Sequence, residues 1–262
     1  MNAEIAKLMI VDTAGFAFSV AAVGKALENE KARSQDYDYY DPDYPPLCPN
    51  GKMDEYTIDD FIVRNLNVNY RLQLLKGVEK IGTTMPKGKV MKALQWDCDL
   101  EQAAINALPA NCPEDKPVAL ANKTGIFYSL NIGIQPDILT AMDFWTSEKK
   151  KVSVNVDGTA VRYVNSSVTN YLNLMRSTAS KIGCAEHTCK EGDLYKFRAY
   201  CITNAPLAHN ISVHVKTENR LNSSSPLQNN DVMYEVGNGG CLKGDNCPTG
   251  SNCVTFGLCK DI

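Results

Sequence analysis

Ten cysteines in a chain of 262 residues constrain the fold more than any other feature of this sequence. A chain of this length can bury a hydrophobic core without covalent cross-links. No two cysteines form a C-x-x-C pair, and none of their spacings matches a zinc finger. We therefore predict five disulfides and an oxidising compartment.

Charge and histidine content exclude several classes of function. The 27 basic and 30 acidic residues leave a net charge of −3, which provides no electrostatic footprint for nucleic acid. Of only three histidines, His187 is interpreted as a strand or turn residue, and His209 and His214 as surface residues rather than a metal site. No G-x-S-x-G nucleophile turn occurs, which argues against a serine hydrolase.

The N-terminal part of the chain indicates export. Residues 8–23 are mostly apolar, so residues 1–24 are predicted to be a signal peptide, with an amphipathic helix as the alternative because Asp12 interrupts the run. No segment is suited to span a membrane. Residues 25–46 are predicted to be an acidic linker rich in Tyr and Pro, whose tyrosines are hypothetical sulfation sites.

Four sequons are candidate glycosylation sites in a secreted protein: Asn122, Asn165, Asn210 and Asn222.

The rest of the chain mixes helical and strand patterns. Apolar residues at helical spacing predict helices over 57–76, 97–109, 136–149 and 166–181. The first begins at the capping box Thr57–Asp60 and the second at the N-cap Asp97. Strands are predicted over 125–130 and 194–203, with a hairpin over 152–164. This order predicts an α+β fold rather than regular βαβ winding.

Several motifs together resemble one known family. Residues 91–101 match the pattern M-x-x-L-x-W-D-x-x-L-E, Trp145 and Glu148 form a W-x-x-E motif, and residues 182–184 are Ile-Gly-Cys. These motifs resemble the CAP superfamily (cysteine-rich secretory proteins, antigen 5 and pathogenesis-related 1), and in particular its nematode Ancylostoma-secreted-protein group. The resemblance covers about residues 47–262.

The resemblance implies the architecture and the domain limits. It implies a CAP α-β-α sandwich, in which an antiparallel sheet is flanked by helices, with a small disulfide-rich C-terminal extension. The CAP (SCP) domain is expected at 47–216, and a linker with a Cys-rich tail at 217–262. It also implies disulfides Cys48–Cys112 and Cys184–Cys201, which leaves Cys98–Cys189. The four tail cysteines (Cys241, Cys247, Cys253 and Cys259) pair among themselves in one of three ways.

The family's catalytic-type cleft is degenerate in this sequence. Typical members line it with two His and two Glu, which sometimes hold a divalent cation, but here Asn170 stands in place of one His and only Glu148 is retained. No His occurs between Cys112 and Phe127. A lone carboxylate can neither hold Zn²⁺ nor form an acid/base pair. We therefore expect no catalytic residues, no metal, no cofactor and no enzymatic activity.

A candidate binding motif lies between two tail cysteines. Lys243, Gly244 and Asp245 form a basic-Gly-Asp triplet, which integrins of the platelet type recognise through the basic group and a carboxylate. Some hookworm members of the family are described as platelet inhibitors. The alternative is a chance triplet, since such motifs have a high false-positive rate.

The leading hypothesis is a secreted, non-catalytic effector that binds host or cell-surface proteins, with an integrin as one candidate. The alternative is a secreted lipid- or sterol-binding protein, in which the apolar faces of the helices at 137–149 and 166–181 line a groove. Those faces are also what a plain protein core requires.

Overall fold

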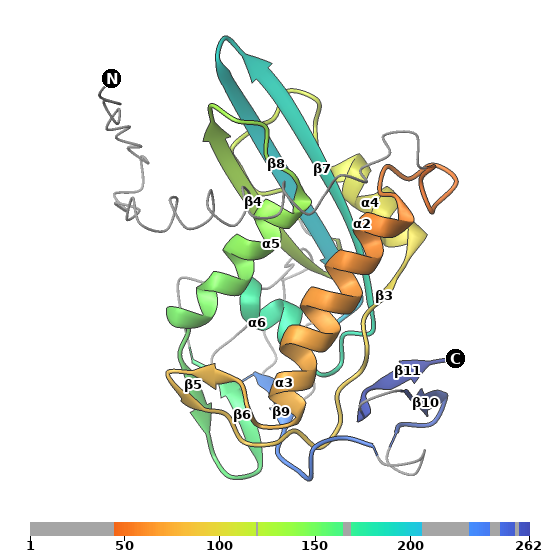
Figure 1. Ribbon diagram of the computed structural model, residues 1–262, viewed down its shortest axis with the longest axis vertical. Helices are drawn as coiled ribbons and strands as arrows, with labels where there is room; N and C mark the ends of the chain where they lie inside the picture. The colour runs from red at the N-terminus through yellow and green to blue at the C-terminus, as the bar shows by residue number, and fades with distance from the viewer. Residues whose placement is uncertain (1–44, 119, 165–168, 206–230, 242–246, 255–256) are drawn as a thin grey trace, which may run out of the picture. The chain divides into compact units, whose positions relative to one another are not determined.

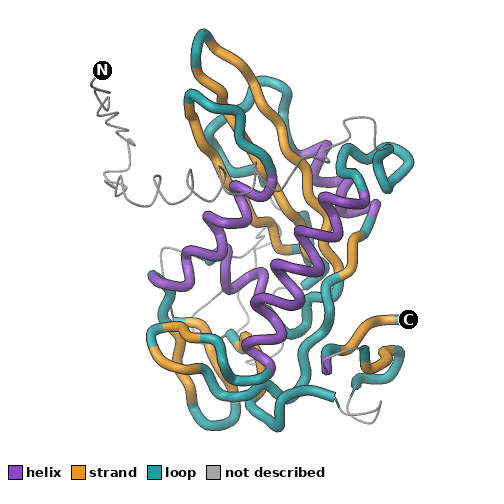
Figure 2. The backbone as a smooth tube through the Cα atoms, viewed as in Figure 1, coloured by secondary structure: helices purple, strands orange, loops and turns teal. Residues whose placement is uncertain are grey.

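The computed structural model describes residues 45–118, 120–164, 169–205, 231–241, 247–254 and 257–262 (Figures 1 and 2). Tyr44–Ile262 form one compact unit. The predicted signal peptide (1–24) and all of the predicted linker except Pro45 and Pro46 lie outside the described residues. None of the helices in the described part of the chain has the length and apolar run that a bilayer crossing requires.

A long helix opens the described chain. It consists of three consecutive segments: α2 (Glu55–Asp59), the π-helical η1 (Asp60–Arg71) and α3 (Leu72–Leu75). Its N-cap is Asp54, whose carboxylate accepts a hydrogen bond of 2.8 Å from the Thr57 backbone N–H. The predicted capping box at Thr57–Asp60 is therefore wrong by about one turn, because an earlier aspartate supplies the cap.

The central sheet has the strand order β3-β7-β8-β4. Its strands are β3 (Gln95–Trp96), β7 (Lys181–Glu191), β8 (Leu194–Thr203) and β4 (Thr124–Ile132). β7, β8 and β4 are antiparallel, and β3 runs parallel to the start of β7. The strands predicted over 125–130 and 194–203 are confirmed. β7 was expected only from the family resemblance at residues 182–184 and from the interpretation of His187. The hydrophobic pattern does not reveal it, because its second half is half-buried and polar and lacks an apolar alternation.

Helices cover both faces of this sheet (Figure 1). On one face lies α4 (Cys98–Ala107), whose Leu100 and Ala104 belong to a cluster with Tyr200 of β8. The long helix, α5 (Ile138–Ser147) and α6 (Asn170–Met175) share the main core with the other face, around the fully buried Trp145. This α-β-α sandwich confirms the predicted fold class.

The predicted N-cap Asp97 is confirmed, since its carboxylate accepts a hydrogen bond of 3.0 Å from the Leu100 N–H. The helix predicted over 166–181 is wrong in its second half. α6 ends at Met175, and Arg176 has extended backbone angles. The apolar pattern that continued to Ile182 therefore does not reflect further helical turns. It reflects buried positions in an extended segment, to which the buried Arg176 also belongs, and in β7.

Smaller sheets complete the unit. Their strands are β1 (Lys80–Ile81) with β2 (Thr83–Thr84), and β5 (Val154–Val156) with β6 (Ala160–Tyr163) and β9 (Val232–Glu235). The predicted hairpin over 152–164 is confirmed as β5–β6. At its turn, Gly158 has a φ of 82°, a left-handed conformation that glycine adopts without steric cost.

The C-terminal tail packs directly on the core. Its hairpin consists of β10 (Ser251–Cys253) and β11 (Cys259–Asp261). Cys259 donates its N–H to Met91 O and accepts from Ala93 N at 3.0 and 2.7 Å. Leu258 is buried in the main core, and Lys92 pairs with Asp261 at 2.9 Å. The tail is thus part of the compact unit rather than a module that is held only by a tether.

Five disulfides are present, as predicted, and the described residues include no free cysteine. The pairs are Cys48–Cys98, Cys112–Cys189, Cys184–Cys201, Cys241–Cys253 and Cys247–Cys259. The expected pairs Cys48–Cys112 and Cys98–Cys189 are therefore wrong, whereas Cys184–Cys201 is found between directly paired residues of β7 and β8.

The physical reason for the corrected pairs lies in α4. Glu101, one turn after Cys98, accepts hydrogen bonds of 2.7 and 3.1 Å from the backbone N–H groups of Lys52 and Met53. These contacts hold the segment after Cys48 against the start of α4, next to Cys98. The loop that follows the other end of α4 brings Cys112 to β7 and Cys189.

A buried guanidinium connects three parts of the core. Arg71 is fully buried at the end of η1. It donates to Lys92 O (3.0 and 2.6 Å), Leu174 O (2.6 Å) and Ala179 O (2.9 Å). Burial lowers the pKa of this group, and the three carbonyl oxygens provide the polar partners that a buried charge requires.

We expect Arg71→Ala to lower the free energy of unfolding by about 3 kcal/mol or more, because it leaves three buried carbonyl groups without their donor. Arg71→Lys is expected to recover only part of this loss, since an ammonium lacks the planar fork. Urea denaturation at neutral pH measures both. Asn69→Ala is the control, because Asn69 lies on the same helix and is exposed. It should change stability by less than about 0.5 kcal/mol, and an equal loss in Asn69→Ala and Arg71→Ala would contradict this account.

Candidate functional site

Glu148 is the carboxylate around which the candidate site is built. It begins the short η2 helix (Glu148–Lys150), directly after α5. Asp137 caps α5 in a capping box with Thr140. Trp145 anchors the other end of α5, because its indole Nε1 donates to Phe127 O of β4 at 3.2 Å. The W-x-x-E motif thus joins an anchoring Trp to a carboxylate that is only 4% exposed.

Both carboxylate oxygens of Glu148 already have partners. Asn170 Nδ2 donates to Oε1 at 2.8 Å, and the Tyr171 backbone N–H donates to Oε2 at 3.0 Å. Burial raises the pKa of Glu148, and these hydrogen bonds oppose the shift without cancelling it. Asn170, which stands where the family has a His, therefore acts as a donor to the carboxylate at the start of α6.

Lys116 supplies a positive charge near Glu148 that the sequence analysis missed. Its Nζ donates to Gly125 O at 2.9 Å, although part of the side chain is exposed. Burial lowers the pKa of Lys116, and the charge of Glu148 raises it. The only available signal was position, since Lys116 falls in the segment between Cys112 and Phe127 where the family's histidine was sought. Nothing in its local pattern distinguishes it from a surface lysine.

Other buried polar side chains have structural roles, and several positions named from the sequence lie outside the described residues. Asn67, in the long helix, exchanges two hydrogen bonds of 2.9 Å with the backbone of Leu94. Arg176 is buried and is attracted by Asp231. Of the sequons, Asn122 lies in an exposed turn. The positions outside the described residues are Asn165, His209, Asn210, His214, Asn222, Lys243, Gly244 and Asp245.

The ends of the candidate integrin-binding loop are described even though residues 242–246 are not. Cys241 and Cys247, which flank the loop, form disulfides with Cys253 and Cys259 of the β10–β11 hairpin. The hairpin pairs Cys253 directly with Cys259. Both ends of the loop are therefore fixed covalently to one small element that rests on the core.

The fold and the site together define a class of protein: a disulfide-bonded α-β-α sandwich in which the buried carboxylate of Glu148 is satisfied by an asparagine and a backbone N–H. The model of the cysteine-rich secretory protein family, CAP, matches residues 63–203, which is more than half of the chain. The chain belongs to this family. No curated protein matches the sequence.

Solved structures support the same conclusion. Na-ASP-1 has a TM-score of 0.63 and 25% identity over 82% of this chain and 48% of its own, so this chain spans about half the length of Na-ASP-1. BmVAL-1 has a TM-score of 0.61 and 21% identity over 82% of this chain and 98% of its own. The hookworm platelet inhibitor has a TM-score of 0.51 and 19% identity over 82% and 96%.

The residues of the Glu148 site do not fit the divalent cation that some family members hold. Zn²⁺ requires three or four protein ligands, commonly His, Cys or carboxylate. Here Asn170 directs an amide N–H, which is a donor, at Glu148, and the positive charge of Lys151 acts on the same carboxylate. The site therefore holds one anionic ligand group among hydrogen-bond donors.

The raised pKa of Glu148 predicts a direction for the pH dependence of stability. A carboxyl group whose pKa is raised by folding binds its proton more tightly in the folded state, so stability falls as the pH rises through the raised pKa. We expect the wild type to lose stability relative to Glu148→Gln as the pH rises from about 4 to about 7, because the glutamine has no charge to bury. The amide NH₂ of the glutamine faces a donor at every pH, so that cost does not change across the range. Urea denaturation across this range measures the difference, with exposed Glu55→Gln as the control. A pH-independent difference would contradict the assignment.

Proposed function

We propose that the protein is a secreted, non-catalytic CAP-family effector that binds host or cell-surface proteins. The observation that carries the proposal is the Glu148 site, where the one retained carboxylate is occupied by hydrogen bonds from Asn170 and Tyr171. Acid/base catalysis in such a cleft uses a second positioned group, whereas the groups bonded to Glu148 here, Asn170 Nδ2 and the Tyr171 N–H, are hydrogen-bond donors. Membership of the CAP family and five disulfides support secretion.

The proposed recognition element is Lys243-Gly244-Asp245, with an integrin as partner. Support comes from the two disulfides that fix Cys241 and Cys247 at the ends of this short segment. A loop with fixed ends loses less conformational entropy when it binds than a free one. The likeness to the hookworm platelet inhibitor extends to the fold only, and it makes a platelet integrin the first partner to test.

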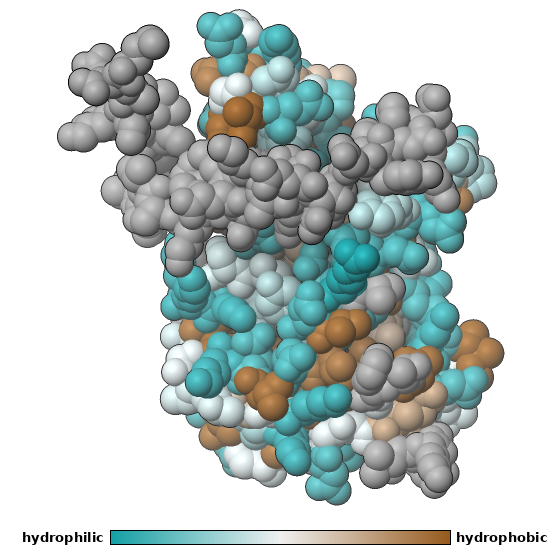
Figure 3. Space-filling model, in the orientation of Figure 1, coloured by the Kyte–Doolittle hydropathy of each residue, from teal (hydrophilic) through white to brown (hydrophobic). Residues whose placement is uncertain are grey.

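The alternative of lipid or sterol carriage has little structural support. The apolar faces of α5 and α6 that would line a groove are buried in the core: Ile138, Leu139, Met142, Tyr171, Leu172 and Met175 are each at most 8% exposed. A surface pocket of about 420 Å³ beside β6 and β9 is lined by Lys89, Arg162 and Glu235, among others. On the face seen in Figure 3, hydrophilic side chains interrupt the apolar patches.

We expect Asp245→Ala to weaken binding to a purified platelet integrin by at least about tenfold, because it removes the carboxylate that would complete the receptor's metal site. Surface plasmon resonance with the secreted form, with and without a chelator that strips the integrin, measures this. Asp193→Ala, in the exposed turn between β7 and β8, is the matched control and should bind like the wild type.

The outcomes distinguish the proposed Lys-Gly-Asp binding mode from the broader proposal that the protein binds host or cell-surface proteins. Equal binding by Asp245→Ala and Asp193→Ala would exclude the Lys-Gly-Asp mode and leave the broader binding function in place. Absence of binding by the wild type to any host cell surface would count against the broader function itself.

A further inference from the structure

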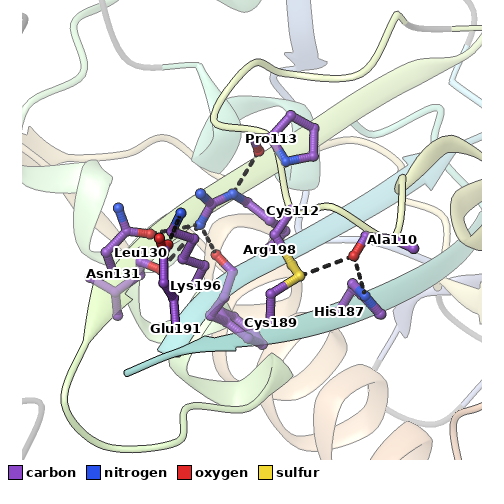
Figure 4. Close-up of a disulfide and its surroundings, with 11 residues drawn as sticks. Ala110, Cys112, Pro113, Leu130, Asn131, His187, Cys189, Glu191, Lys196 and Arg198 are labelled. Carbon is purple, nitrogen blue, oxygen red and sulfur yellow. Dashed lines mark hydrogen bonds and ion pairs between the residues drawn. A yellow bond between two sulfur atoms is a disulfide. The ribbon is translucent and has the colours of Figure 1, made fainter. Parts of the chain in front are cut away.

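A cluster of potential metal ligands surrounds the Cys112–Cys189 disulfide (Figure 4). His187 and Cys189 lie two residues apart on β7, on the same face of the strand. Cys112 faces them from the loop after α4. One ligand atom from each of the three residues lies within 4.8 Å of the other two. These residues belong neither to the Glu148 site nor to the tail.

The geometry of the cluster agrees with the dimensions of a zinc site. Zn–S distances of about 2.3 Å place two thiolates of one tetrahedral site about 3.8 Å apart. The three ligand atoms lie within 4.8 Å of one another, and the two sulfurs, which are bonded in the disulfide, have to move apart to reach these distances once the bond is open. A disulfide sulfur is not a zinc ligand, whereas the thiolates released on reduction are.

Contacts other than the disulfide hold the loop in place. Arg198, which pairs with His187 across β7 and β8, is buried and donates to Pro113 O at 2.6 Å. Its NH1 also donates to Leu130 O and Asn131 Oδ1, and Asn131 donates to Glu114 at 3.2 Å. Arg198 therefore connects the residue after Cys112 to the sheet, and this connection remains when the disulfide is reduced.

The surroundings of His187 are also suited to metal binding. The ring nitrogen Nε2 lies 3.2 Å from Ala110 O. In the tautomer whose Nε2 carries the proton, this nitrogen donates to the carbonyl and Nδ1 keeps a lone pair. Zinc-bound histidines commonly donate their second N–H to a backbone carbonyl in this way. His187 and Cys189 are half-buried, which gives a small reductant and a metal ion access to the cluster.

We propose that reduction of Cys112–Cys189 converts this cluster into a Zn²⁺ site formed by Cys112, His187 and Cys189, with water as the fourth ligand. The reductant is a dithiol. One of its thiolates attacks Cys189 Sγ and releases the Cys112 thiolate, and its second thiol then closes a cyclic disulfide and releases the Cys189 thiolate. Two electrons pass from the dithiol to the protein disulfide. Zn²⁺ binding displaces the two thiol protons to solvent. The metal then replaces the covalent bond between the loop and β7.

The test uses the full mature chain, reduced with dithiothreitol and freed of it by gel filtration under argon. Differential alkylation and mass mapping establish whether Cys112 and Cys189 are thiols, and Co²⁺ serves as the spectroscopic probe with Zn²⁺ as competitor. We expect thiolate-to-Co²⁺ charge-transfer bands and tetrahedral ligand-field bands in the reduced wild type only. The oxidised protein should show neither.

His187→Ala is the decisive variant, because it removes one ligand and leaves all five disulfides intact before reduction. We expect it to weaken Zn²⁺ binding by more than about tenfold, since even loss of an outer-shell partner costs 10- to 100-fold. His209→Ala is the matched histidine control and should bind like the wild type. The tail also places Cys241, Cys247 and Cys253 within 4.8 Å of one another, but their binding would not depend on His187.

Three outcomes would overturn the proposal: a Cys112–Cys189 bond that stays closed while the protein remains folded, absence of the cobalt bands when both thiols are mapped as free, or equal affinity in His187→Ala and the wild type. The urea midpoints of the oxidised His187→Ala variant and the oxidised wild type serve as a control for folding. If they are equal, a weaker binding of Zn²⁺ by the variant is not caused by unfolding.

Discussion

The Arg71 guanidinium is the interaction on which the rest of the structure depends. It is fully buried and makes four hydrogen bonds to carbonyl groups of three segments. These segments are the 91–101 motif, the end of α6 and the chain before β7. Because the desolvation of a guanidinium is costly unless its donors are satisfied, the three segments can pack only in an arrangement that presents their carbonyls to it. One residue thereby fixes the long helix relative to the sheet.

Glu101 holds α4 in place on the opposite face of the central sheet. Its carboxylate is fully buried, and it accepts from Lys52 N, Met53 N and Trp96 Nε1. α4 lies so close to β7 that a Cβ on Gly183 would be 2.1 Å from Glu101 N, which explains why glycine occupies that position. The strongest sequence motif of this chain therefore encodes packing: its Trp, Asp and Glu hold α4 in place and contribute nothing to the Glu148 site.

Local signals were predictable from the residues themselves, whereas the tertiary features that were predicted correctly, the α-β-α sandwich and Cys184–Cys201, followed from the family resemblance. Asp97, the β5–β6 hairpin and the W-x-x-E motif each follow from residues close in sequence, and the structure contains them as expected. The polar half of β7 is a strand because β8 pairs with it along its whole length, which no local pattern reveals. The partners of Cys48 and Cys112 depend on where α4 packs, and the contact of Lys116 with Gly125 O depends on how the loop after Cys112 folds back onto β4. The proposed loop at 243–245 remains a sequence-based prediction.

The distribution of buried polar groups bears on where recognition can occur. Arg71, Glu101 and Glu148 are each satisfied by neighbours within the compact unit, so their charges stabilise the scaffold and are not presented to a partner. The proposed recognition would then fall to segments whose residues do not make these core contacts. The stretch between Cys241 and Cys247 is such a segment, since its ends are cross-linked to a hairpin that the core already holds through Cys259 and Asp261. A rigid scaffold with short anchored loops keeps the entropic cost of binding low without any chemistry in the site.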